Sequence, residues 1–342
     1  MTRVALDAMG SDAFPVPDVH GAVAAAREYG VEVILVGDEP RIAPTLNAAN
    51  AKGLPIRLVH APEMLTMQDK GEELALKARH RDARNSMAVA IDLVKRGEAD
   101  AFVTAGNTGA ALVTSLFRLG RVHGVDRPAL AAVFPTATGT CVVLDIGANP
   151  DCKPENLLQF AIMGSLFAER VRGVHNPSVG LVSNAEEEGK GNELVKAATP
   201  LLRSSGLNFY GNVEGKELIG GKVDIAVADG FVGNVILKTS EAVAKLIIDK
   251  MRESIKSGGP LALAGGALVK PALGKVKRLL DPAEEGAAPL LGVNGLVFIG
   301  HGRSDAFAIK NAIRVARDAA EAGFLDALRT AIEESLLARP VS

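Results

Sequence analysis

The feature that most limits the possible folds of this chain is a regular alternation of short apolar runs with longer amphipathic segments. Strands are expected at Arg3–Ala8, Val31–Val36, Ile56–Val59, Ala101–Thr104, Cys141–Ile146, Val179–Val182, Asn208–Val213, Val223–Ala228 and Leu296–Ile299. Helices are expected at Val16–Tyr29, Arg41–Ala51, Gln68–Arg79, Ser86–Arg96, Ala110–Phe117, Glu155–Val171, Asn192–Ser204, Asn234–Ile255, Asp305–Glu321 and Asp326–Leu337. This alternation predicts one α/β domain over residues 1–342, with a doubly wound, largely parallel sheet and helices on both faces.

Composition narrows the class of protein. The chain has 342 residues, 48% of them hydrophobic, which is enough for a large core. A net charge of −2 and an aromatic content of 4% argue against nucleic-acid binding. Two cysteines in a chain of this length are typical of a reducing compartment. The first residues do not resemble a signal peptide, and the longest uncharged run, Pro128–Leu144, is too short and too interrupted to cross a membrane. We therefore expect a cytoplasmic protein, and association with a membrane surface stays open.

The stretch Ala101–Ala111, with the sequence AFVTAGNTGAA, joins an expected buried strand to an expected helix through a Gly-Asn-Thr-Gly turn. The aligned peptide dipoles make the start of a helix positive, so such a turn suits an anion such as phosphate. The alternative is an ordinary turn in which Asn107 caps the helix.

Polar residues follow the ends of several expected strands. They are Asp7, Asp145, Asn184, Asp229 and His301, and asparagines accompany them at Asn107, Asn149, Asn192 and Asn234. Ligands of such sheets bind beyond the carboxyl ends of the strands, so these loops are expected to form one site at one edge of the sheet. Any single loop is better explained as a turn, because glycine, asparagine and aspartate are also turn residues, and it is the coincidence of all these loops that favours a site.

Several standard motifs are absent from the sequence. It contains no P-loop and no G-x-S-x-G elbow, and GKGNEL at Gly189–Leu194 lacks the third glycine of a dinucleotide fingerprint. The six histidines are scattered without zinc-like spacing. The sequence therefore offers no standard nucleotide-binding or zinc-binding motif.

Eight segments together resemble one family. They are DAMGSD at Asp7, TAGNTGA at Thr104, LDIGANPDCKPENLLQFAIMGS at Leu144, EEEGKGNELVK at Glu186, GNVEGKE at Gly211, VADGFVGNVILKTSE at Val227, and APLLGVNG with HGRSDAFAIKNAIR near the end. In this order, over nearly the whole chain, they resemble the PlsX family of bacterial phosphate acyltransferases.

The resemblance implies a reaction in which long-chain acyl-[acyl carrier protein] and inorganic phosphate give acyl phosphate and free carrier protein. It further implies a phosphotransacetylase-like fold, a homodimer, and no cofactor or metal. The acyl phosphate would pass to a membrane acyltransferase of the PlsY type, and so feed phospholipid synthesis.

Within this family reaction, Lys190 is the first candidate for a cationic catalytic group and Asn234 for its polar partner. Without the resemblance, Lys190 is better explained as a surface lysine, and Asn234 is explained equally well as a helix cap. Phosphate or the pantetheine end of the substrate is expected at Asn107, Thr108 and Gly109. The remaining candidates for substrate binding are Asp7, Asp145, Asn149, Lys153, Asn192, Asp229 and His301. Asp145 either orients Lys190 or closes a turn.

Phosphate is already a nucleophile at neutral pH and a thiol is a good leaving group, so positioning and charge stabilisation should dominate catalysis. Cys152 is the alternative, as a nucleophile that would carry the acyl group. We favour direct attack by phosphate, because no histidine lies near Cys152 in the sequence. Cys141 lies inside an apolar strand and is expected in the core.

Three other functions stay open at this point. A phosphotransacetylase would use a coenzyme A thioester, and a metal-dependent hydroxy-acid dehydrogenase of related shape would need NAD(P) and a divalent ion. A non-enzymatic scaffold at the membrane surface would bind carrier protein without transferring an acyl group.

The segment 256–280 departs from the strand–helix alternation, since it carries five Lys or Arg residues and no acid. Its apolar residues recur at helical spacing, and Gly258, Gly259 and Pro260 separate it from the preceding helix. We expect residues 240–285 to form a protruding helical hairpin. A basic amphipathic surface fits anionic lipid headgroups or an acidic carrier protein, and part of the apolar stripe fits a second subunit.

Overall fold

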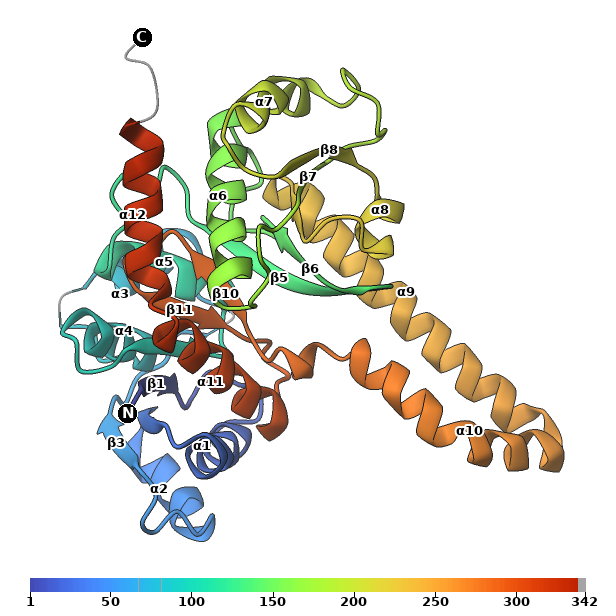
Figure 1. Cartoon of the computed structure of the whole chain (residues 1–342). Coiled ribbons are helices and arrows are strands. Elements are labelled where there is room, and N and C mark those ends of the chain that lie inside the picture. The colour runs from blue at the N-terminus through green and yellow to red at the C-terminus, as the bar shows by residue number, and fades with distance from the viewer. Residues whose placement is uncertain (67, 81, 338–342) are drawn as a thin grey trace.

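The computed structural model describes residues 1–66, 68–80 and 82–337, except for the side chain of Lys277, and is drawn in Figure 1. The strands are β1 Arg3–Asp7, β2 Glu32–Gly37, β3 Ile56–His60, β4 Ala101–Thr104, β5 Ala129–Thr136, β6 Gly139–Leu144, β7 Val179–Val182, β8 Phe209–Val213, β9 Ile225–Val227, β10 Ala288–Leu291 and β11 Leu296–Ile299. The helices are α1 Val16–Tyr29, α2 Glu39–Ala48, α3 Gly71–Arg79, α4 Ser86–Lys95, α5 Thr108–Arg118, α6 Pro154–Arg170, α7 Glu193–Arg203, α8 Gly215–Gly220, α9 Gly230–Ser257, α10 Gly259–Leu279, α11 Ala306–Glu321 and α12 Phe324–Leu337. A short 3₁₀ turn, Pro282–Glu284, precedes β10.

All of these strands belong to one sheet, in the order β3-β2-β1-β4-β11-β10-β5-β6-β9-β7-β8. Helices cover both of its faces (Figure 1). This confirms the predicted α/β architecture with mostly parallel strands. Strands β5 and β10 and the short helix α8 were not predicted.

The sheet consists of two parallel halves that run in opposite directions. Strands β1, β2, β3, β4 and β11 are parallel to one another, and so are β6, β9, β7 and β8. Between the halves, β10 is antiparallel to β11, β5 to β10, and β6 to β5. These three reversals place the carboxyl ends of β1, β4 and β11 along one side of the sheet and those of β6, β7 and β9 along the opposite side. We call these two rows of strand ends the first and the second edge. The expectation that all the polar loops share one edge is therefore wrong.

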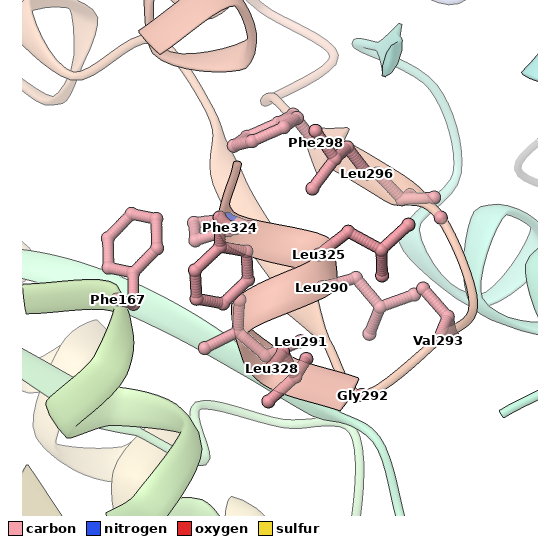
Figure 2. A pocket seen from close by; sticks show the side chains of 13 residues that line it. Phe167, Leu290, Leu291, Gly292, Val293, Leu296, Phe298, Phe324, Leu325 and Leu328 are labelled. Carbon is pink, nitrogen blue, oxygen red and sulfur yellow. The ribbon is translucent and has the colours of Figure 1, made fainter. Parts of the chain in front are cut away.

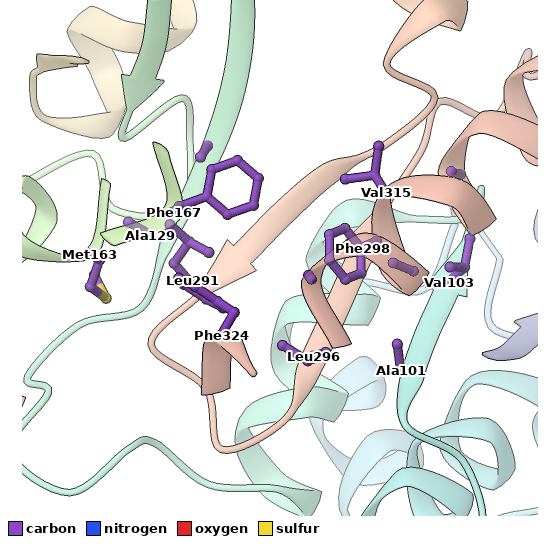
Figure 3. Close-up of a cluster of buried hydrophobic side chains, with 14 of the residues drawn as sticks. Ala101, Val103, Ala129, Met163, Phe167, Leu291, Leu296, Phe298, Val315 and Phe324 are labelled. Atoms are coloured by element: carbon purple, nitrogen blue, oxygen red, sulfur yellow. The ribbon is translucent and has the colours of Figure 1, made fainter. Parts of the chain in front are cut away.

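The core lies in two layers, one on each face of the sheet. Successive residues of β1 alternate between them, since Val4 and Leu6 belong to one buried cluster and Ala5 to the other. The first layer lies beneath α1, α6, α11 and α12, and Figure 3 shows part of it. There Phe167 of α6 meets Phe324 of α12 edge to face, with ring centroids 5.7 Å apart. This contact ties the two halves of the sheet together.

Helices α9 and α10 form the predicted hairpin, which protrudes from the body of the protein (Figure 1). Its α10 arm is widely exposed: Leu261 is 87% and Leu268 83% accessible. Within the described residues, no helix has both the length and the apolar character needed to cross a bilayer. The hairpin is thus a surface feature with exposed leucines and lysines.

Candidate active site

The first group of predicted residues lies at the carboxyl ends of β1 and β4. Asp7 is buried, and its carboxylate accepts a hydrogen bond of 2.8 Å from the Thr104 hydroxyl. That hydroxyl in turn accepts one of 2.9 Å from the Gly106 N–H. Burial raises the pKa of Asp7, while hydrogen bonds from Ser86 and Thr104 act in the opposite direction. Asp7 therefore supports the Gly-Asn-Thr-Gly turn from below and does not reach its surface.

The turn itself leads directly into α5, which begins two residues earlier than predicted. Asn107 is the N-cap: its side-chain oxygen accepts from the Ala110 N–H at 3.1 Å, and its amide donates to the Thr66 carbonyl at 3.0 Å. Thr108 and Gly109 occupy the exposed first turn. Backbone N–H groups in a first helical turn point out of the helix and create a positive end. The capping role of Asn107 thus coexists with a surface suited to an anion.

The second group lies at the carboxyl end of β6, at the other edge. Asp145 is completely buried, and its two oxygens accept five hydrogen bonds of 2.7–3.1 Å, from the N–H groups of Leu130, Gly147, Ala148 and Asn149 and from the Asn149 amide. The Asn149 amide also donates to the Pro128 carbonyl at 2.7 Å. Burial raises the pKa of Asp145, and the Ala148 N–H and Asn149 amide oppose this. These contacts close the turn, which supports the second of the two roles considered for Asp145.

Helix α9 starts beside this turn. Asp229 is its N-cap and accepts from the Val232 N–H at 2.8 Å, so the cap is not Asn234. Gly233 packs so closely on β6 that a Cβ there would collide with the Asp145 carbonyl. Asn234 is exposed in the second turn, and its Cγ lies 3.8 Å from the place that a Cβ on Gly147 would take. The tight packing of α9 therefore presents the Asn234 amide over the backbone of the 147 loop.

Lys190 lies in the loop between β7 and α7, with an exposed side chain. Its N–H donates to the Glu187 carbonyl at 3.2 Å, which closes a tight turn. Gly189 and Gly191 have φ angles of +84° and +101°, which glycine adopts readily. Asn192 caps α7 by accepting from the Val195 N–H at 2.9 Å. Lys153 is exposed at the start of α6.

His301, at the end of β11, belongs to the first edge but faces α9. Its Nε2 lies 3.7 Å from Oε1 of Glu241. Burial lowers the pKa of His301, Glu241 opposes this, and Lys238 adds to it. Glu241 and Lys238 were missed, although they follow Asn234 by seven and four residues and so share its helical face.

The polar face formed by Asn234, Lys238 and Glu241 connects the two edges of the sheet. The part of α9 from Gly230 to Glu241 is about 16 Å long, at roughly 1.5 Å per residue. A five-residue strand has about the same length, at about 3.3 Å per residue, so this part of the helix is long enough to extend from one edge of the sheet to the other. It begins beside the 145–149 turn and reaches His301 three turns later. The predicted residues therefore form separate groups on two edges, which α9 bridges.

Neither cysteine is prepared for nucleophilic attack. Cys152 is half-buried, and its thiol donates to the Asn149 carbonyl at 3.5 Å. Burial, with a smaller contribution from Asp145, raises the pKa of Cys152 to about 12. Cys141 is buried in β6 as expected, and burial raises its pKa to about 12 as well. Both thiols are protonated at neutral pH.

An apolar pocket shown in Figure 2 is unrelated to these groups. It lies between β10, β11 and α12, with Phe167, Leu291 and Phe298 in its lining, and holds only about 10 Å³. None of its lining residues is a predicted site residue. It is a gap in core packing, too small for a substrate.

The comparisons with known proteins agree with the fold and the motifs. The family model described as "Fatty acid synthesis protein" matches residues 2–327. The chain is 50% identical to the phosphate acyltransferase of Pelotomaculum thermopropionicum, over 97% of this chain and 95% of the relative. It is 49% identical to that of Desulforamulus reducens, over 97% and 98%.

Among solved structures, a phosphotransacetylase from Streptococcus pyogenes is similar with a TM-score of 0.59 and 16% identity, over 94% of each chain. At this identity the likeness establishes the phosphotransacetylase-like fold alone. The near full-length match to the family model and to relatives at this identity shows that the chain belongs to the PlsX family of phosphate acyltransferases.

Proposed function

We propose that this acyltransferase makes acyl phosphate from long-chain acyl-[acyl carrier protein] and inorganic phosphate. Family membership over nearly the whole chain is the observation that carries the proposal. Acyl phosphate is an activated acyl donor, so the product would feed the acylation of glycerol 3-phosphate by a PlsY-type membrane enzyme on the way to phosphatidic acid.

The acyl group passes directly from the thioester sulfur to a phosphate oxygen. Phosphate attacks the carbonyl carbon, a tetrahedral oxyanion forms, and the C–S bond breaks. The leaving sulfur takes up the proton that the phosphate gives up and departs as the carrier thiol. The high pKa of Cys152 supports this route over an acyl-enzyme, because a protonated thiol is a poor nucleophile. The chain then has to hold phosphate and stabilise the oxyanion, and needs no strong base.

Residues on exposed loops take the substrate roles in this proposal. The first turn of α5, with Thr108 and Gly109, binds phosphate through its N–H groups and the Thr108 hydroxyl. The Lys190 ammonium and the Asn234 amide stabilise the developing negative charge, so the proposal requires the α5 turn and these two residues to close around one substrate along the polar face of α9. His301, Lys153 and Asn192 complete the rim, whereas the buried Asp7, Asp145 and Asn149, together with the Asp229 cap, hold the loops in shape.

The hairpin supplies the partner contacts in this proposal. The segment 256–280 contains no acid, and the exposed leucines of α10 lie among its basic residues. A surface of this kind attracts anionic lipid headgroups, and inserts its apolar residues below them. The apolar residues of α9 that are exposed in a single subunit, such as Leu246 and Ile247, would pack in a homodimer. Peripheral membrane contact would shorten the path of an amphipathic product to its membrane enzyme.

The test is the formation of acyl phosphate from palmitoyl-acyl carrier protein and phosphate, trapped as the hydroxamate. The Lys190→Ala variant should lose activity by about 10²–10³-fold, the effect of removing one oxyanion donor. Lys196→Ala is the matched control, since Lys196 is exposed nearby and pairs with Glu193 within α7. Normal turnover in a folded Lys190→Ala protein would remove Lys190 from the mechanism. A clear preference for palmitoyl-coenzyme A at equal concentration would contradict the proposed acyl donor.

A further inference from the structure

A buried asparagine lies directly beneath the Lys190 loop. Asn212 is 7% accessible and lies near the end of β8, which pairs with β7 through Leu181 and Asn212. Its amide donates a hydrogen bond of 3.2 Å to the Glu187 carbonyl. The same carbonyl accepts the Lys190 N–H at 3.2 Å. One carbonyl oxygen thus joins a fixed strand to the backbone of Lys190.

Resting on the proposed function, we infer that Asn212 is a positioning residue for Lys190, acting through the Glu187 carbonyl. Lys190 is exposed and lies between Gly189 and Gly191, which both have positive φ angles. Because glycine has no Cβ, its backbone adopts many conformations, and this part of the loop can rearrange easily. A lysine in such a loop places its ammonium reproducibly only if the backbone is tied to a rigid element. The strand pairing of β8 makes Asn212 such an element.

The remaining hydrogen-bond capacity of Asn212 argues against a purely stabilising role. Within the described residues, its side-chain oxygen is buried and has no partner, and the same holds for the hydroxyl of Ser183 on neighbouring β7. A buried polar atom without a partner lowers stability, so an apolar side chain at position 212 would suit the fold better. The presence of an asparagine at position 212 is therefore explained by the hydrogen bond that its amide donates to the Glu187 carbonyl.

Two outer ion pairs support the same loop but hold it less firmly. Glu186 pairs with Lys216 at 2.5 Å, and Glu188 with Arg203 at 3.0 Å. All four side chains are exposed, and exposed ion pairs contribute little because water screens them. Among the described residues, Asn212 is the one that ties the backbone of this stretch to a strand of the sheet.

The experiment uses two variants and a matched control in the full-length protein. Asn212→Leu keeps a buried side chain and removes the amide, while Asn212→Asp is isosteric and turns an oxygen toward the Glu187 carbonyl. Asn208→Asp is the control, because Asn208, exposed just before β8, also donates an amide hydrogen bond to a loop carbonyl, at 3.0 Å to Asn176. Thermal melting establishes that each variant is folded.

Both Asn212 variants should lower kcat for acyl phosphate formation at least tenfold, and Asn208→Asp should leave it unchanged. Adding Asn212→Leu to Lys190→Ala should cause no further loss, because residues that act as a unit are not additive. Amide hydrogen exchange at Lys190 should speed up at least tenfold in Asn212→Leu, whatever reaction the enzyme catalyses.

A folded Asn212→Leu protein with wild-type kcat, or with unchanged exchange at Lys190, would overturn the inference. A full further loss in the double variant would also overturn it, since Asn212 would then act independently of Lys190. Failure of the proposed function looks different: the wild-type protein would form no acyl phosphate, while the exchange result would still decide whether Asn212 holds Lys190 in place.

Discussion

Asp18 on α1 makes the stability of this protein depend on pH in a predictable direction. The residue is fully buried, the Ser11 hydroxyl donates to one of its oxygens at 2.5 Å, and its other oxygen has no partner within the described residues. Burial raises the pKa of Asp18 to about 7, Ser11 opposes this, and the charge of Asp7 adds to it. The folded protein therefore holds a proton on Asp18 that the unfolded chain releases.

A folded-state pKa above the unfolded value gives stability that is complete below about pH 4 and is lost as the pH rises through about 7. With a shift from 3.8 to about 7, this one carboxyl should lower the free energy of unfolding by roughly 2.5 kcal/mol between about pH 5 and about pH 8. The Asp18→Asn variant has a neutral side chain of the same shape, with an oxygen that can accept from Ser11. Its stability relative to the wild type should therefore increase by that amount over this range.

Urea unfolding followed by circular dichroism at several pH values measures the difference. Asp12→Asn is the control, because Asp12 is an exposed aspartate in the loop that carries Ser11. The reasoning is refuted if the difference between wild type and Asp18→Asn is independent of pH, or if it changes with pH no more than the difference between wild type and Asp12→Asn does.

Three further predictions test the proposed site and surface. Thr108→Val should raise the KM for phosphate with little change in melting temperature, and an unchanged phosphate dependence would make the turn purely structural. Cys152→Ala should stay active, and intact mass should detect no acyl-enzyme when phosphate is omitted; a thioester on Cys152 would contradict direct attack. Changing Lys275 and Arg278 on α10 to glutamate should weaken binding to anionic vesicles while the proposed homodimer and the activity on soluble substrate persist. Unaffected vesicle binding would leave the hairpin a dimer element, and loss of activity on carrier protein alone would make it the docking surface.

Most helices and parallel strands could be predicted because each is a periodic apolar segment between turn residues. The two strands that were missed, β5 and β10, each contain a proline, at Pro135 and Pro289. Proline argues against a central strand because it lacks the N–H that a second neighbour would need. Pro289 pairs with β11, while β5 joins β10 only at Leu290 and Leu291. Pro135 likewise pairs only with β6, because β10 pairs with β5 at Ala129 and Leu130 and does not extend to Pro135. Each proline therefore pairs with a strand on one side only, and the sequence around it does not show this.

Missing these two strands changed the expected arrangement of the site. Strands β10 and β5 are the elements through which the sheet reverses direction, so without them all carboxyl ends seem to share one edge. The loops themselves were correctly placed after strands. What could not be predicted was that Asp7 and Asp145 turn inward, since an aspartate after a strand can equally bind a ligand or its own loop.

Capping and ligand binding use the same residue types, and this limits what a local pattern can establish. Asn107, Asn192 and Asp229 each accept from the N–H three residues ahead, and for Asn107 that bond leaves the exposed first turn of α5 available to an anion. Helix α9 separates the two roles in space: Asp229 caps it, whereas Asn234 presents its amide one turn later beside Gly147. Lys238 and Glu241 lie further along the same helix, near His301. Helix α9 therefore forms one polar surface that extends between the two edges of the sheet. Its helical spacing is visible in the sequence, but its bridging role follows only from the reversed strands.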